Sequence, residues 1–190
     1  RIQHMFWRYI DPKHPSPVEN VEEFGDTIPE MYRRMDALVG ETVEQLGSDD
    51  ILMILSDHGF SSFRRCVNLN TWLYENGYLA IKGDKTPEGL DYLQEVDWSR
   101  TAAIKKVYDT RKAYKGLYTN EAPDLIVGYY PGYRVSWDSI TGTIEPEVFS
   151  DNVKAWSGDH HVDPEEVPGI FFVNQPLKTD VPHIIDIAPT

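Results

Sequence analysis

The chain has 190 residues, of which 41% are hydrophobic and 26% charged, and its formal net charge is −13. This length and composition are ordinary for one soluble globular domain with a sizeable core. Such an acidic chain repels nucleic-acid backbones, so we expect no nucleic-acid scaffold as a partner. A small anionic substrate would need a local cation, and a metal ion is one candidate.

The cysteine count and the hydropathy further limit the class of protein and its compartment. The single cysteine, Cys66, can build neither an internal disulfide nor a cysteine-based metal site. This pattern fits a reducing compartment, so it favours the cytoplasm without fixing the location. No apolar run approaches the roughly 18 residues of a transmembrane helix, so we expect no membrane segment. Because the first residue is Arg1, we expect the chain to begin inside a longer protein.

The first clear elements are a helix and the strand after it. Residues 28–47 have apolar side chains at helical spacing, with Thr27 suited to the N-cap and Gly47 to the position after the last turn. The run "ILMIL" (51–55) is apolar at every position, which is typical of a parallel strand buried on both faces. We therefore predict an α/β fold with a mostly parallel sheet flanked by helices, in which 51–55 is an interior strand.

Further elements follow along the chain. Residues 68–83 predict a short helix that stops at Gly77 and then a strand. Residues 84–122 are polar with weak periodicity. Two more apolar strands are predicted, at 125–127 and at 170–173.

Histidine lies beside polar residues in three places: "QH" (3–4), "SDHG" (56–59) and "SGDHHVD" (157–163). The second directly follows the strand 51–55, where ligand sites of open α/β sheets lie. Imidazole and carboxylate together suit zinc, and two ions about 4 Å apart form the usual clamp for phosphoryl transfer. Taken singly, each place is equally well explained by a helix cap with a hydrogen-bonded histidine.

A resemblance to a known family joins these places. In chain order, the matching stretches are "LSDHGF", "VNLNTWLYENGYL", "PDLIVGYYPGYRVSW", "WSGDHHVDPEEVPGIFFVN" and "IIDIAPT". They resemble the alkaline phosphatase superfamily, and within it the type I phosphodiesterase/nucleotide pyrophosphatase branch. The resemblance implies that residues 1–190 are a single fragment, the C-terminal half of an alkaline-phosphatase-like catalytic domain. A small cap-like insertion is expected within 59–157.

The resemblance also implies a chemistry, namely metal-dependent hydrolysis of small nucleotide-type phosphodiesters or phosphomonoesters. Two divalent ions would be bound, zinc in the first instance and manganese as the alternative. Asp57 and His58 would hold one ion, and His4 and His160 the other. A Thr or Ser nucleophile and further ligands would lie upstream of Arg1, so the chain alone is expected to be inactive.

Several residues near these motifs keep two interpretations. His161 is the alternative ligand to His160, although the G-x-H spacing favours His160. Asp159, His161 and Asp163 either orient the imidazoles or are ordinary loop residues. Arg134 either meets a phosphate or forms a structural salt bridge, and we favour the salt bridge. His14 is predicted to be a solvated loop residue.

Other functions remain open at this point. Within the superfamily, a phosphoglycerate mutase-like or sulfatase-like enzyme would differ in its nucleophile. A non-catalytic metal-binding module would keep the same ligands without turnover. We favour the hydrolase. The substrate, the metal in the cell and the oligomeric state are not predicted by the sequence.

Overall fold

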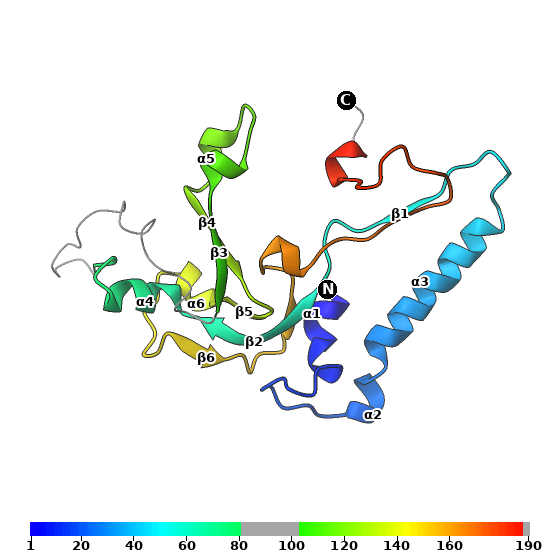
Figure 1. The fold of residues 1–190 in the computed structure, drawn as a ribbon. Coiled ribbons are helices and arrows are strands. Elements are labelled where there is room, and N and C mark those ends of the chain that lie inside the picture. Colours follow the sequence, from blue (N-terminus) through cyan, green and yellow to red (C-terminus); the bar gives the residue numbers. More distant parts are fainter. Residues whose placement is uncertain (81–102, 188–190) are drawn as a thin grey trace.

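The structure is a computed structural model that describes residues 1–80 and 103–187 (Figure 1). Its longer helices are α3 (Thr27–Val43) and α4 (Leu69–Glu75), and the shorter α-helices are α1 (Ile2–Phe6), α2 (Val21–Phe24), α5 (Thr110–Ala113) and α6 (Trp137–Ile140). The 3-10 turns are η1 (Trp7–Tyr9), η4 (Thr119–Glu121), η5 (Pro164–Glu166) and η6 (Ile184–Asp186). Among the described helices, none combines the length and the apolarity that a bilayer span requires.

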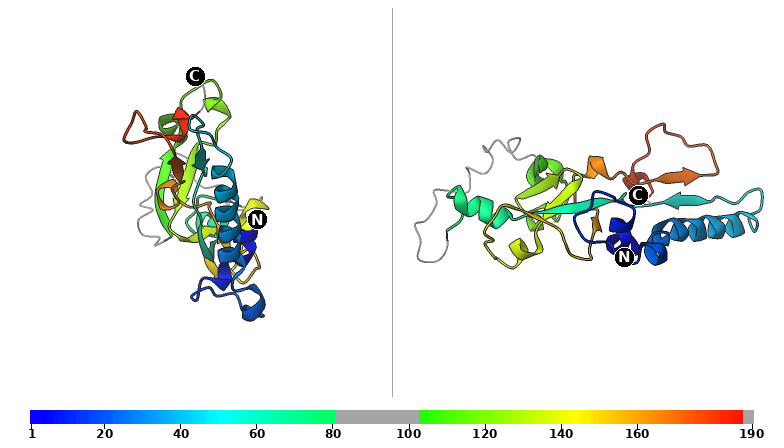
Figure 2. Two further views of the ribbon diagram at one scale, coloured as in Figure 1. Left: turned by 90° about the vertical axis from the view of Figure 1, so that its right-hand side faces the viewer. Right: turned by 90° about the horizontal axis from the view of Figure 1, so that it is seen from below.

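Eight strands are described, and they form small separate sheets. They are β1 (Met53–Leu55), β2 (Ser61–Val67), β3 (Ile104–Asp109), β4 (Leu125–Tyr129), β5 (Gly132–Val135), β6 (Phe149–Asp151), β7 (Gly158–Asp159) and β8 (Phe171–Val173). β2 pairs in parallel with β5 and antiparallel with β6 and β7. β1 pairs antiparallel with β8, and β3 with β4. The right-hand view of Figure 2 shows an elongated molecule, with α3 and the β1–β8 ribbon at one end and α4 towards the other.

The fold confirms the mixed α/β class, but a mostly parallel sheet is not confirmed. Within the described residues, the β2–β5 pair is parallel and the remaining pairs are antiparallel. The prediction that 51–55 is an interior strand is wrong for the part of the chain described. β1 has one described neighbour, and Met53 and Leu55 are 50% and 44% exposed. An all-apolar run is typical of a strand covered on both faces, but it does not show what covers them, and among the described residues these side chains stay partly exposed.

The other predicted elements are largely confirmed. α3 begins one residue before the predicted helix, with Asp26 rather than Thr27 as its N-cap, and it ends at Val43, before Gly47. α4 begins after Asn68, and Gly77 follows it with a φ of +79°, a conformation that glycine adopts without strain. β4 and β8 correspond to the two predicted apolar strands. The strand predicted after Gly77 runs into residues outside the described ranges.

The apolar core lies between the β2 sheet and the β3–β4 hairpin, which projects upward in Figure 1. Its buried members are Val67, Ala103, Ile104 and Tyr129. Half-buried side chains from β3, β4, β5 and β6 pack around them. These four buried residues lie in the range 59–157, within which the cap-like insertion is predicted. Part of that range lies outside the described residues, and the insertion stays a prediction.

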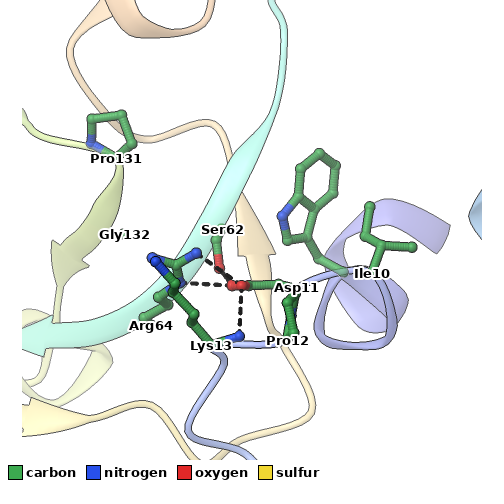
Figure 3. Close-up of a pocket in the computed structure, with 9 residues that line it drawn as sticks. Ile10, Asp11, Pro12, Lys13, Ser62, Arg64, Pro131 and Gly132 are labelled. Carbon is green, nitrogen blue, oxygen red and sulfur yellow. Dashed lines mark hydrogen bonds and ion pairs between the residues drawn. The ribbon is translucent and has the colours of Figure 1, made fainter. Parts of the chain in front are cut away.

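A partly buried ion pair joins the N-terminal segment to β2 (Figure 3). The Asp11 carboxylate accepts hydrogen bonds from Arg64 Nε and Nη2 at 2.7 and 2.8 Å, and from the Ser62 hydroxyl. It lies beside an open pocket of about 480 Å³, which Trp7 and Pro131 also line. Burial raises the pKa of Asp11, but the hydrogen bonds from Arg64 and Ser62 outweigh burial and lower it to about 2.

His14 is buried, so the prediction of a solvated loop residue is wrong. Its Nδ1 accepts the Ser16 backbone N–H at 3.1 Å, so Nε2 carries the proton donated to the Phe63 carbonyl at 2.8 Å. Both bonds require the neutral imidazole. The sequence around His14, between Lys13 and Pro15, gives no sign of this contact, because its partner lies on β2.

We expect the Asp11–Arg64 pair to make stability depend on pH in the acid range. The folded pKa of about 2 lies below the ordinary 3.8, so the stabilisation is present above pH 3.8 and is lost as the pH falls towards 2. It amounts to at most about 2 kcal/mol, because Arg64 is partly exposed to solvent. Urea unfolding of Asp11→Asn should show this loss at pH 7 and little difference from wild type at pH 2. An equal loss at both pH values would contradict the ionic origin.

We expect Gly158→Ala to destabilise the fold by about 1–3 kcal/mol, because a Cβ atom there would lie 2.6 Å from Trp7 Cβ and from the Phe60 ring. The matched control is Gly40→Ala on the exposed surface of α3, where a Cβ meets nothing within 4 Å. That change should stabilise the protein by about 0.5–1 kcal/mol, because alanine favours the helix. Free energies of unfolding in urea check both. A neutral effect of Gly158→Ala would show that this close approach is absent.

Candidate metal centre

The centre forms where β7 pairs with the beginning of β2. Ser61 lies opposite Asp159 and Ser62 opposite Gly158 in this antiparallel pair. His58, which precedes β2, therefore meets His160, which follows β7, and their rings stack with centroids 3.8 Å apart. Two residues distant in the sequence thus reach the same place through one short strand pair.

His4 reaches the same place from α1. Its backbone carbonyl accepts the Ser157 N–H at 2.7 Å, and its ring lies 5.5 Å from the His160 ring, centroid to centroid. The Trp156 indole stacks on the His4 ring at 3.9 Å. His4, His58 and His160 therefore come together, as the sequence motifs had predicted for a shared site. Their role as metal ligands stays a prediction.

Asp57 lies directly after β1, at the carboxyl end of the strand, as its position after "ILMIL" predicted. Its Oδ1 accepts the His58 N–H at 3.1 Å, and its Oδ2 lies 3.6 Å from His58 Nε2. The side chain is 77% exposed. Asp57 and His58 thus present a carboxylate and an imidazole side by side.

Close backbone contact explains the glycine beside this pair. Gly59 N–H donates to the Val167 carbonyl at 2.8 Å, and a Cβ on Gly59 would lie 2.9 Å from the Pro168 carbonyl oxygen. Gly59 is not among the glycines with positive φ. The residue is therefore needed for the approach of the 167–168 segment, which leads into β8.

Three imidazoles at the centre, those of His4, His58 and His161, donate a hydrogen bond from Nδ1, as judged from their partners. His4 Nδ1 lies 2.7 Å from the Gly158 carbonyl, and His58 Nδ1 lies 2.7 Å from the Gly59 carbonyl. His161 Nδ1 lies 2.5 Å from Asp159 Oδ1. Because carbonyl and carboxylate oxygens only accept, each Nδ1 carries a proton. In the neutral ring, Nε2 then keeps its lone pair, which is the arrangement found in metal-binding histidines.

Burial also favours neutral rings at the centre. It lowers the pKa of His4 from its ordinary value of 6.5, and the Gly158 carbonyl opposes the shift only in part. Burial likewise lowers the pKa of His160, and the neighbouring His58 and His161 lower it further. A neutral imidazole is the form that binds a metal ion.

Asp159 is more deeply buried than the sequence indicated. It is 1% exposed, and its Oδ2 lies 3.0 Å from Arg134 Nε and accepts the Trp156 indole N–H at 2.8 Å. The preference for a structural salt bridge at Arg134 is confirmed. Within the described residues, Asp159, His160 and His161 form a group whose ligand atoms all lie within 4.8 Å of one another.

Asp163 makes its contacts away from the imidazoles. It accepts the Tyr108 hydroxyl at 2.8 Å and the Glu165 N–H at 3.1 Å, which caps η5. Lys105 Nζ lies 3.5 Å away. These contacts hold the η5 turn against β3, and none of them supports an orienting role towards the histidines.

The family is decided by comparison with known proteins. The model of the family described as type I phosphodiesterase / nucleotide pyrophosphatase matches residues 1–132. The chain belongs to this family. The matched segment contains His4, Asp57 and His58, whereas His160 and His161 follow it. Comparisons with curated proteins and with solved structures find no match.

Membership of this family gives the activity at a coarse level. The family is one of phosphodiesterase and pyrophosphatase hydrolases that depend on metals in general. Among the described residues, Asp159, His160 and His161 bring one carboxylate and two imidazoles close enough together to hold a metal ion, and donors of this kind suit a divalent cation. Trp156 was missed by the sequence reasoning. Its place in the sequence, two residues before β7, was the one available signal.

We expect His4 and His160 to titrate below pH 6.5 in the folded, metal-free chain, because burial lowers the pKa of both rings. A ring that is held neutral in the fold contributes stability above pH 6.5, and that stability is lost as the pH falls. Histidine titration followed by NMR gives the two midpoints directly. Midpoints above 6.5 would contradict the buried, neutral arrangement.

Proposed function

We propose that the protein is a metal-dependent hydrolase of small phosphodiesters or phosphomonoesters of the nucleotide type. The observation that carries the proposal is the set of imidazoles whose Nδ1–H groups are engaged by protein oxygens. His4 and His58 both have this arrangement, and it leaves the Nε2 lone pairs available to a metal ion. Family membership supports the hydrolytic class.

Two divalent ions, zinc or alternatively manganese, are the proposed cofactors. Asp57 and His58 would hold one ion, and His4 and His160 the other. Within each pair the side chains are neighbours, since Asp57 Oδ2 lies 3.6 Å from His58 Nε2 and the His4 and His160 ring centroids lie 5.5 Å apart. When bound, such ions neutralise charge on phosphoryl oxygens and lower the pKa of a bound nucleophile.

The residues of the chain contribute orientation and charge. The Gly158 and Gly59 carbonyls hold the rings of His4 and His58 in one tautomer, and the stacked Trp156 restricts rotation of His4. Neutral imidazoles add no positive charge to the site, and Asp57 adds one exposed carboxylate. The cation required by a phosphate ester is then supplied by the metals rather than by Arg134, which is paired with Asp159.

The proposal predicts that Asp57→Asn lowers both zinc affinity and hydrolysis. Residues that merely orient metal ligands are worth about 10- to 100-fold, so we expect a direct ligand to cost roughly 100-fold or more. Zinc affinity is measured by calorimetry on the metal-free protein. Hydrolysis of bis(p-nitrophenyl) phosphate and p-nitrophenyl phosphate is measured in the protein at its natural full length, with added zinc or manganese.

The matched control is Asp151→Asn on β6. It makes the same chemical change at another exposed carboxylate, which pairs with Arg65 away from the histidines. This control should bind zinc and turn over substrate as wild type does. Full activity in Asp57→Asn, with zinc affinity equal to that of the control, would refute the proposed ligand set.

A further inference from the structure

The Asp159 carboxylate lies at the junction of the histidine cluster. Its Oδ1 accepts three N–H groups, namely His160 N at 2.8 Å, His161 N at 3.1 Å and His161 Nδ1 at 2.5 Å. Its Oδ2 accepts the Trp156 indole N–H at 2.8 Å. Each carboxylate oxygen has about two lone-pair positions, so Oδ1 is fully engaged by its three N–H groups, and Oδ2, which also lies 3.0 Å from Arg134 Nε, has both positions occupied.

A buried cation balances the charge of this carboxylate. Arg134 is 4% exposed, its Nε lies 3.0 Å from Asp159 Oδ2, and its guanidinium stacks on the Trp137 ring at 3.8 Å. Nε and Nη1 of Arg134 have no aligned hydrogen bond among the described residues, so Asp159 balances the guanidinium by charge. Removing either charge would leave the other buried and uncompensated.

Asp159 accepts hydrogen bonds from His160 and His161, and it is linked to His4 through Trp156. It holds His161 directly through Nδ1 and holds His160 through its backbone N–H. It holds His4 indirectly, because the indole that donates to Oδ2 is the one stacked on the His4 ring. Asp159 also lies on β7, so the β2–β7 pairing fixes its backbone.

We propose that Asp159 is a positioning residue and not a metal ligand, although it belongs to the group with His160 and His161 that is compact enough to hold an ion. Its carboxylate, fixed by Arg134 and Trp156, sets the Nδ1–H tautomer of His161 and restricts the His4 and His160 rings. The part of this proposal that concerns metal affinity rests on the proposed function. The part that concerns the tautomer rests on the metal-free chain alone.

The tautomer is tested by long-range ¹⁵N–¹H NMR on the metal-free 190-residue chain above pH 8. Wild-type His161 should show a protonated Nδ1 and an unprotonated Nε2. Asp159→Ala removes the acceptor, so His161 should change to a mixture of tautomers or to the Nε2–H form. An Nε2–H form of His161 in wild type, or no change in Asp159→Ala, would overturn the proposal.

Metal affinity separates positioning from ligation. Trp156→Phe keeps an aromatic ring for His4 but removes the N–H that holds Asp159, and neither side chain can ligate zinc. We expect it to weaken zinc binding roughly 10-fold by competition with a chromophoric chelator. Wild-type affinity in Trp156→Phe, together with complete loss in Asp159→Ala, would show that Asp159 is a ligand and would overturn the proposal.

The matched control is Asp163→Ala. Asp163 is fully buried like Asp159 and caps a turn, but its carboxylate contacts Tyr108 and Lys105 instead of an imidazole. In Asp163→Ala, the His161 tautomer and the zinc affinity should equal those of wild type. An equal effect of Asp159→Ala and Asp163→Ala would reduce the role of Asp159 to general stability. If Asp159→Ala fails to fold, the wild-type tautomer of His161 and the zinc affinity of Trp156→Phe carry the test. Absence of zinc binding in wild type would refute the proposed function, whereas the tautomer still decides whether Asp159 positions His161.

Discussion

The candidate centre depends on the pairing of β7 with the first residues of β2. This two-residue ladder brings His160 beside His58, although about one hundred residues of chain separate them. It also requires Gly158, because the Trp7 and Phe60 side chains occupy the space that a Cβ would need. The packing of α1 against the same backbone then places His4 beside His160. One close backbone approach therefore determines where three imidazoles meet.

Local signals predicted the elements better than their arrangement. Helical spacing located α3, and the apolar runs located β4 and β8, because these features depend on residues near one another in the sequence. The place of β1 was not predictable, because a strand's neighbours are chosen by contacts across the chain. His14 illustrates the same limit. Its burial comes from a hydrogen bond to Phe63 on β2, which no local pattern records.

The candidate site shows a similar contrast between what the sequence predicted and what depends on contacts across the chain. The order of the motifs predicted that His4, His58 and His160 would share one place, because a functional motif constrains residues whatever their separation. The order of the motifs did not predict that the Arg134–Asp159 ion pair supports this site. Both residues have ordinary loop or strand neighbours in the sequence, and their interaction depends on β5 and β7 flanking the same strand.

The electrostatics of the centre are consistent with a site that receives both cations and an anion. The chain has a net charge of −13, and Asp159, the deeply buried carboxylate nearest the rings, is neutralised by Arg134. Burial favours the neutral form of the His4 and His160 rings. If Asp159 were instead free to take a metal, Arg134 would remain buried beside a shared carboxylate, and its desolvation would be poorly compensated. The proposed arrangement, with the imidazoles and the exposed Asp57 as ligands and Asp159 as the residue that positions them, is therefore the one that leaves no buried charge uncompensated.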